Sequence, residues 1–222
     1  MSNQSNSKPS ILLLAVVAIV SIGAGLLLWN FVFQPKPVTV PEEIARSYIP
    51  AGRPVVGIQM TDQDGQPFTE QRFKGKWSFL FFGFTNCPDV CPTTLLVMKS
   101  VWNKLPAEAK QTPEPQMVFV SVDPDRDKPE QLKPYVKFYH PEFMAMTGAH
   151  DKLDILAVQV GALYGYEDGE KEGEYTVNHS AQVILIDPDG HFRGVFSTPH
   201  VVDDIVNGFT AIRQYHEKVK KR

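Results

Sequence analysis

The segment that decides the fold runs from Phe79 to Leu96 and reads FLFFGFTNCPDVCPTTLL. It contains both cysteines of the chain, Cys87 and Cys91. The apolar run at its start predicts a buried strand. Pro92 suits the first position of a helix, because the N–H that proline lacks has no partner there. The cysteines are therefore expected in the strand-to-helix loop and at the start of the helix, where unpaired N–H groups favour a thiolate over a thiol.

The spacing of the two cysteines allows two kinds of chemistry. A gap of three residues lets both sulfurs turn to the same side, so the pair can bind a soft metal or close a redox-active disulfide. The competing interpretations are a purely structural disulfide and a pair of small buried side chains. Asn86, Pro88 and Asp89 argue against a core position, because they keep this loop stiff and near the surface.

The amino-terminal part of the chain carries no charge from Ile11 to Phe33, a run of 23 residues. A helix over this run, at about 1.5 Å per residue, would span a hydrocarbon core of roughly 30 Å. A cleaved signal peptide is the alternative, but its apolar region would be shorter and would end at a cleavage site of small residues. We expect an uncleaved transmembrane signal anchor at 11–33, preceded by a cytoplasmic tail at 1–10 and followed by a proline-punctuated tether at 34–54.

The remaining residues, 55–222, have the pattern of one α/β domain. The net charge of −3 gives no indication of nucleic-acid binding. The order of elements predicts a mixed sheet covered by helices on both faces. That order is a hairpin around 62–65, a strand at 76–85, a helix at 92–105, a strand at 117–122, a helix at 129–139, a short strand at 143–146, a helix at 150–163, an acidic loop at 167–174, strands at 175–186 and 191–196, and a helix at 201–220.

A third group for the cysteine site is expected among the six histidines. His179 differs from the others because it lies at the mouth of the apolar run 183–186, which a mixed sheet can bring beside the cysteine loop. His200, in a loop after a proline, stays an alternative. Two thiolates and one imidazole suit copper, since thiolates select Cu(I) and imidazole binds both copper states. A structural zinc site would normally need a fourth ligand, and the chain has no third cysteine.

Three blocks of the sequence resemble the Sco/SenC family: GFTNCPDVCPTTL at 83–95, SVDPDRDKPEQL at 121–132 and VNHSAQVILIDPDG at 177–190. The resemblance extends from about Val55 to the last helix and includes the single amino-terminal span. It implies a thioredoxin-like mixed sheet flanked by helices, with one amino-terminal transmembrane helix. The family's copper ligands carry over to Cys87, Cys91 and His179. Many members have an acidic residue before this histidine, where the present chain has Asn178.

The resemblance also implies a function. It indicates a membrane-anchored copper metallochaperone that holds one copper per chain, as Cu(I), Cu(II) or both. Such a protein would deliver copper to the binuclear site of a respiratory cytochrome c oxidase. The expected partners are the copper-bearing subunit of that oxidase and an upstream copper donor or thiol reductant, with no nucleic acid. The expected location is the bacterial inner membrane, single-pass, with the soluble domain on the periplasmic side.

The runner-up function is enzymatic. A thiol–disulfide oxidoreductase would cycle Cys87 and Cys91 between dithiol and disulfide and keep the cysteines of the oxidase copper site, or of another partner, reduced. The acidic residues of the second block, Asp123, Asp125 and Asp127, are expected to form turns and caps, because carboxylates are hard ligands and Cu(I) is soft.

Overall fold

The computed structural model describes residues 11–32, 40–169 and 175–221, and the chain divides into two compact units after Thr39. The first unit contains helix α1 (Ile11–Val32). By length and hydropathy, no helix in these described ranges qualifies as a membrane span. The anchor expected at 11–33 therefore stays a prediction. The tail expected at 1–10 and the first part of the expected tether, 33–39, lie outside the described residues.

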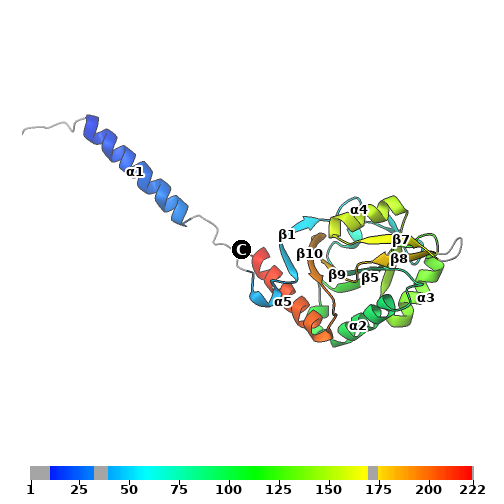
Figure 1. Cartoon of the computed structure of the whole chain (residues 1–222). Coiled ribbons are helices and arrows are strands. Elements are labelled where there is room, and N and C mark those ends of the chain that lie inside the picture. The colour runs from blue at the N-terminus through cyan, green and yellow to red at the C-terminus, as the bar shows by residue number, and fades with distance from the viewer. Residues whose placement is uncertain (1–10, 33–39, 170–174, 222) are drawn as a thin grey trace, which may run out of the picture. The chain divides into compact units, whose positions relative to one another are not determined.

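The second unit is built on a central mixed sheet (Figure 1). Within the described residues its eight strands run in the order β1-β10-β9-β4-β5-β6-β2-β3. The pairs β4–β5 and β5–β6 are parallel, and the other pairs are antiparallel. The strands are β1 (Tyr48–Pro54), β2 (Met60–Asp62), β3 (Pro67–Phe68), β4 (Trp77–Gly83), β5 (Pro115–Ser121), β6 (Met144–Thr147), β9 (Val183–Ile186) and β10 (His191–Phe196).

Helices cover both faces of this sheet, as the order of elements predicts (Figure 1). One face packs against α2 (Val90–Lys104), α3 (Pro129–Tyr139) and α5 (Val202–Lys220). The other packs against α4 (His150–Val160). Strand β4 is buried along its whole length, with Phe79 and Phe81 on the first face and Leu80 and Phe82 on the second. A strand buried on both faces reads as a continuous apolar run, because successive side chains enter opposite layers.

A separate two-stranded hairpin lies outside the central sheet. Its strands are β7 (Tyr164–Asp168) and β8 (Tyr175–His179), paired so that Tyr164 lies opposite His179. The expected single strand at 175–186 is therefore wrong: it breaks at 180–182 into β8 and β9, which belong to different sheets. The expected acidic loop at 167–174 is wrong at its start, because β7 extends to Asp168, and residues 170–174 lie outside the described part.

The domain also begins earlier than expected. Residues 40–54 belong to the folded unit and not to a tether, since Ile44 is buried in a short 3₁₀ turn, η1 (Glu42–Ile44), and β1 pairs with β10. The prolines in β1 suggested a tether, but an edge strand tolerates proline because one of its sides needs no hydrogen bonds. Two further 3₁₀ turns are η2 (Glu70–Arg72) and η3 (Ala107–Lys110).

Two helix boundaries differ from the sequence expectation in an informative way. Helix α2 begins at Val90, and its first turn is closed by a hydrogen bond from Thr93 N to the Asp89 carbonyl. Pro92 is thus the third helical residue, which is acceptable because the first four N–H groups of a helix have no partner within it. Helix α4 ends at Val160, because Gly161 takes the left-handed conformation with φ of 68° that terminates helices.

Candidate metal centre

The cysteines are placed by the turn between β4 and α2. Cys87 N donates to the Phe84 carbonyl at 3.2 Å, which closes the turn after the strand. Cys91 lies in the first turn of α2 and is fully buried, whereas Cys87 is half-buried. Cys91 N approaches Cys87 Sγ at 3.5 Å, so a helix N–H faces the more accessible sulfur. The spacing therefore turns both sulfurs to one side of the loop.

Gly83, the last residue of β4, makes room for the buried sulfur. A Cβ atom at this position would lie 2.5 Å from Cys91 Sγ and 2.8 Å from the Phe119 ring. Contacts this short do not occur between real atoms, so only glycine leaves Cys91 Sγ where it is. The sequence offers a weak signal of this, because a glycine at the end of an apolar strand often marks a close approach.

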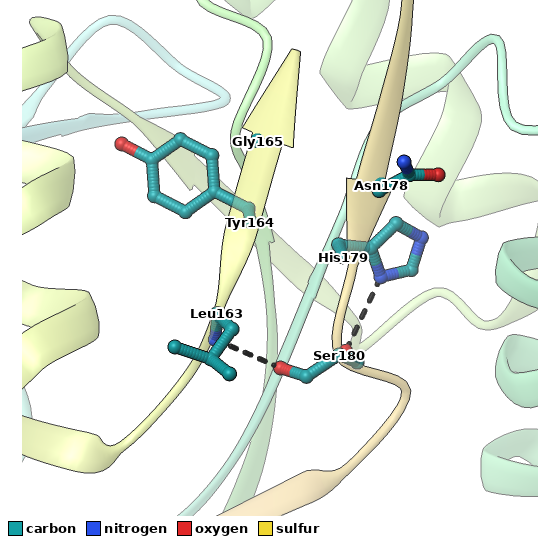
Figure 2. A pocket seen from close by; sticks show the side chains of 6 residues that line it. All are labelled: Leu163, Tyr164, Gly165, Asn178, His179 and Ser180. Carbon is teal, nitrogen blue, oxygen red and sulfur yellow. Dashed lines mark hydrogen bonds between the residues drawn. The ribbon is translucent and has the colours of Figure 1, made fainter. Parts of the chain in front are cut away.

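His179 reaches the cysteines from the end of β8. His179 lies opposite Tyr164 of β7 in the hairpin, and Figure 2 shows its Nδ1 directed at the Ser180 carbonyl, at 3.2 Å. A carbonyl oxygen only accepts hydrogen bonds, so Nδ1 carries the proton and Nε2 keeps its lone pair. Nε2 lies 3.3 Å from Cys91 Sγ and 3.9 Å from Cys87 Sγ. The hydrogen bond thus selects the tautomer in which Nε2 can bind a metal.

The three candidate ligand atoms form one compact cluster. The two sulfurs and an imidazole nitrogen all lie within 4.8 Å of one another. The rings of Phe81 and Phe84 flank His179, each with a centroid separation of 5.9 Å. Two soft sulfurs and one imidazole suit Cu(I), and the imidazole nitrogen can also bind Cu(II). The arrangement is therefore able to hold one copper ion in a largely apolar setting.

Burial controls the protonation of the site. It raises the pKa of the Cys91 thiol far above its usual range, and a backbone hydrogen bond from Phe84 opposes this only in part. Burial also lowers the pKa of His179. The expectation that the helix start would favour a thiolate is therefore wrong for Cys91, because desolvation of the charged form outweighs the helix N–H groups. A metal bound to the Cys91 sulfur would have to displace the thiol proton, so its affinity is expected to rise with pH.

A groove of about 220 Å³ leads from the surface to Cys87 and His179. It is lined by Phe84, Cys87, Pro88, Asp89, Val90, Thr176, Val177, Asn178 and His179. A second hollow of about 300 Å³, whose lining residues are drawn in Figure 2, is lined by both strands of the hairpin and shares Asn178 and His179 with the groove. The site is thus open to a partner on the hairpin side.

Other candidates from the sequence lie elsewhere. His200 Nε2 donates to the Ala181 carbonyl at 2.6 Å and is not part of the cysteine cluster. Asp127 accepts a hydrogen bond from Thr85 N at 2.9 Å, and Asp123 accepts one from the Tyr175 hydroxyl at 2.6 Å. They are structural acceptors outside the cysteine cluster, and Asp123 closes a turn through its carbonyl, as expected. The expected helix cap is wrong, because the N-cap residue of α3 is Lys128.

A second group of potential ligands, absent from the sequence expectations, combines Asp187, Asp189 and His216. Arg193 pairs with Asp187 at 2.7 Å and Lys220 with Asp189 at 2.7 Å. Because both carboxylates already have cationic partners, the group is an ion-pair cluster joining α5 to the turn between β9 and β10.

Comparison with known proteins agrees with this architecture. The SCO1/SenC family profile matches residues 56–214. A protein of Stutzerimonas stutzeri whose name refers to copper binding is 40% identical over 157 residues, covering 71% of this chain and 76% of that protein. The mitochondrial SCO1 homolog 1 of Arabidopsis thaliana is 34% identical over 170 residues, which are 75% of this chain. The chain spans half the length of that Arabidopsis protein.

Solved structures share the thioredoxin-like Sco fold. Arabidopsis thaliana ScoI with copper bound has a TM-score of 0.65 at 34% identity, covering 72% of this chain and 99% of that one. BsSco, described as a member of the Sco family of cytochrome c oxidase assembly proteins with a disulfide switch, has a TM-score of 0.59 at 26% identity and covers 75% and 97% of the two chains. Since the family profile spans most of the folded domain, this chain belongs to the SCO1/SenC family.

Proposed function

We propose that this protein is a copper carrier that binds one copper ion through Cys87, Cys91 and His179 and delivers it to the copper site of a cytochrome c oxidase. The observation that carries the proposal is the cluster of two sulfurs and an imidazole nitrogen within 4.8 Å of one another. The copper-bound Arabidopsis relative and the oxidase-assembly role of BsSco support copper as the cargo and the oxidase as its recipient.

The geometry suits transfer more than permanent storage. Three ligands leave room for an incoming ligand, because structural sites usually close their coordination sphere with a fourth group. The groove beside Cys87 gives such a ligand access to the less buried sulfur. We therefore propose stepwise ligand exchange that begins at Cys87 and ends at the buried Cys91.

The decisive experiment measures loading and delivery with the full chain in detergent. The reduced wild type is expected to bind one Cu(I) per chain under anaerobic conditions, and Cys87→Ser or Cys91→Ser is expected to abolish binding. Ser100→Ala, on the exposed side of α2, serves as the control. Loaded protein should then transfer copper to the metal-free oxidase subunit, measured as copper per subunit after the two proteins are separated. Subsequent one-electron oxidation of that subunit by an added oxidant should produce the absorption of the binuclear site. Loading without transfer, while free Cu(I) metallates the subunit, would overturn the delivery role.

A thiol–disulfide oxidoreductase is the second candidate. It is favoured by the asymmetry of the cysteines, because Cys87 is accessible and Cys91 is buried four residues along. The Cys87 thiolate would attack a partner disulfide, forming a mixed disulfide and releasing one partner thiol. The Cys91 sulfur would then attack Cys87 Sγ, releasing the second partner thiol and leaving a Cys87–Cys91 disulfide. Two electrons and two protons pass to the partner, so an upstream thiol reductant must regenerate the dithiol. This candidate predicts full activity in His179→Ala.

We also propose that residues 11–33 anchor the protein in the bacterial inner membrane, with the copper domain on the periplasmic side. The support is the uncharged run and the helix that 22 of its residues form. The mature protein is expected to keep its amino terminus and to leave membranes only with detergent. Extraction by alkaline carbonate, or a mature chain that starts near Gln34, would show a cleaved signal peptide instead.

A further inference from the structure

The position of His179 depends on a hairpin that is not hydrogen-bonded into the central sheet. Strands β7 and β8 pair only with each other among the described strands. The backbone link from Ser180 N to the Leu163 carbonyl, at 2.8 Å, also lies within this hairpin region. Contacts from other parts of the chain, among them the burial of Val177, therefore contribute to the distance between the imidazole and the sulfurs.

The segment 122–127, which lies in the connection between β5 and α3, contacts the cysteine loop on one side. Asp127 is fully buried and accepts hydrogen bonds from Thr85 N at 2.9 Å and from the Ser121 hydroxyl at 2.6 Å. Thr85 lies two residues before Cys87. Val122 N donates to the Gly83 carbonyl at 2.9 Å. The segment is thus fixed to the loop that carries the cysteines.

The same segment holds the hairpin on its other side through Arg126, through Asp123 and through the Val122 carbonyl, which accepts a hydrogen bond from the Tyr166 hydroxyl. The Arg126 guanidinium lies 3.8 Å from the centre of the Tyr175 ring, and its Nη1 donates to the Tyr175 carbonyl at 3.1 Å. Arg126 also forms an ion pair with Asp123, which accepts a hydrogen bond from the Tyr175 hydroxyl at 2.6 Å. The first residue of β8 is therefore held by a stack and by hydrogen bonds to both its carbonyl and its hydroxyl.

Arg126 also lies near Phe84, one of the two aromatic residues that flank His179. Its guanidinium lies 5.8 Å from the Phe84 ring, and Phe84 lies 5.9 Å from the His179 ring at an angle of 86°. Tyr175, Arg126, Phe84 and His179 thus form a continuous series of contacts from the start of β8 to the imidazole at its end. One side of the Arg126 side chain contacts Tyr175 of the hairpin, and another contacts Phe84 at the start of the cysteine loop.

We propose that Arg126 is a positioning residue for the metal centre: by holding β8 against the cysteine loop, it sets the separation between His179 Nε2 and the two sulfurs. This inference rests on the proposed copper-binding function. A planar guanidinium is suited to the task because it stacks on aromatic rings while its edge donates several hydrogen bonds. Lysine retains the positive charge but lacks the planar face.

The first test is copper affinity of the full chain in detergent. Arg126→Ala is expected to lower Cu(II) affinity about 10–100-fold, the range typical for partners that orient a metal ligand, and to shift the charge-transfer absorption. Arg126→Lys, which can keep the ion pair with Asp123, should show a smaller loss of affinity. If Arg126→Ala does not fold, Arg126→Lys still tests the contribution of the guanidinium stacked on Tyr175.

Arg72→Ala is the matched control. Arg72 also pairs with a buried aspartate, Asp62, and lies over an aromatic ring, Phe68, but it is located near β3. This control should bind copper like the wild type.

The second test separates positioning from general stability. If Arg126 acts through His179, Arg126→Ala should cause no further loss of Cu(I) affinity in a His179→Ala background. An equal loss in both backgrounds would overturn the inference. In the metal-free protein, NMR should show contacts between the His179 ring and the Cys91 β-protons that disappear in Arg126→Ala. Contacts that persist there would also overturn it, whereas a wild type that shows these contacts but binds no copper would overturn only the proposed function.

Discussion

Replacing His179 with alanine is expected to remove Cu(II) binding almost entirely while leaving Cys87–Cys91 disulfide formation intact. Cu(II) prefers nitrogen and oxygen donors in a tetragonal field, and His179 supplies the nitrogen donor of the cluster. Cu(I) tolerates two sulfur ligands, so a fraction of Cu(I) binding should persist. The expected fall in Cu(II) affinity exceeds the roughly 100-fold upper range seen for partners that only orient a ligand.

The measurement is charge-transfer absorption on Cu(II) titration, beside thiol titration after oxidation. His200→Ala is the matched control, because His200 donates to the Ala181 carbonyl and lies outside the cysteine cluster. It should retain the wild-type spectrum. A His179→Ala protein with an unchanged spectrum would show that His179 is not a ligand. The disulfide-reductase interpretation would then gain support, since it needs only the sulfurs.

The second large effect is expected from Gly83→Ala. The added methyl group would lie 2.5 Å from Cys91 Sγ and 2.8 Å from Phe119, so one or both must move. Overpacking of this kind typically costs about 1–3 kcal/mol of unfolding free energy. The sulfur is the end of a short side chain and should be displaced from its present position, 3.3 Å from His179 Nε2. We therefore expect copper affinity to fall at least tenfold, on the order of the effect of misplacing a ligand.

Thermal unfolding and Cu(I) competition against a chelator of known affinity test this prediction together. Gly165→Ala is the control, since a Cβ at Gly165 meets no atom within 4 Å although it lies beside Asn178 in the hairpin. Wild-type affinity in a folded Gly83→Ala protein would mean that Cys91 Sγ can bind copper from another position. The close approach at Gly83 would then be a packing feature only.

Local sequence patterns correctly predicted several of the main strands and helices of the domain. The buried strand around Phe81, the helix after it and the helix over 129–139 follow from apolar runs and from proline at a helix start, which act within a few residues. The mixed sheet with helices on both faces is confirmed as well. The spacing of Cys87 and Cys91 was also a local signal, because a single turn places both sulfurs on one side.

The sequence predictions that were wrong concerned features that depend on long-range contacts. Residues 48–54 look like a tether until β10, about 140 residues later, supplies the hydrogen-bond partner that makes them a strand. The segment 175–186 looks like one strand, yet Tyr175–His179 pairs with β7 and Val183–Ile186 with β4 and β10. Strand pairing is decided by which surfaces meet, and the alternation of side chains along one strand does not contain that information.

By itself, then, the sequence determined the donor chemistry of this protein: two soft sulfurs at one turn and a candidate imidazole, with residues around them that are typical of a copper site. Only the tertiary structure decided the distances of 3.3 and 3.9 Å between His179 Nε2 and the sulfurs, the tautomer set by the Ser180 carbonyl, and the burial that keeps Cys91 a thiol. The physical reason is that ligand preference belongs to each side chain, whereas desolvation and orientation arise from the neighbours that folding brings to it.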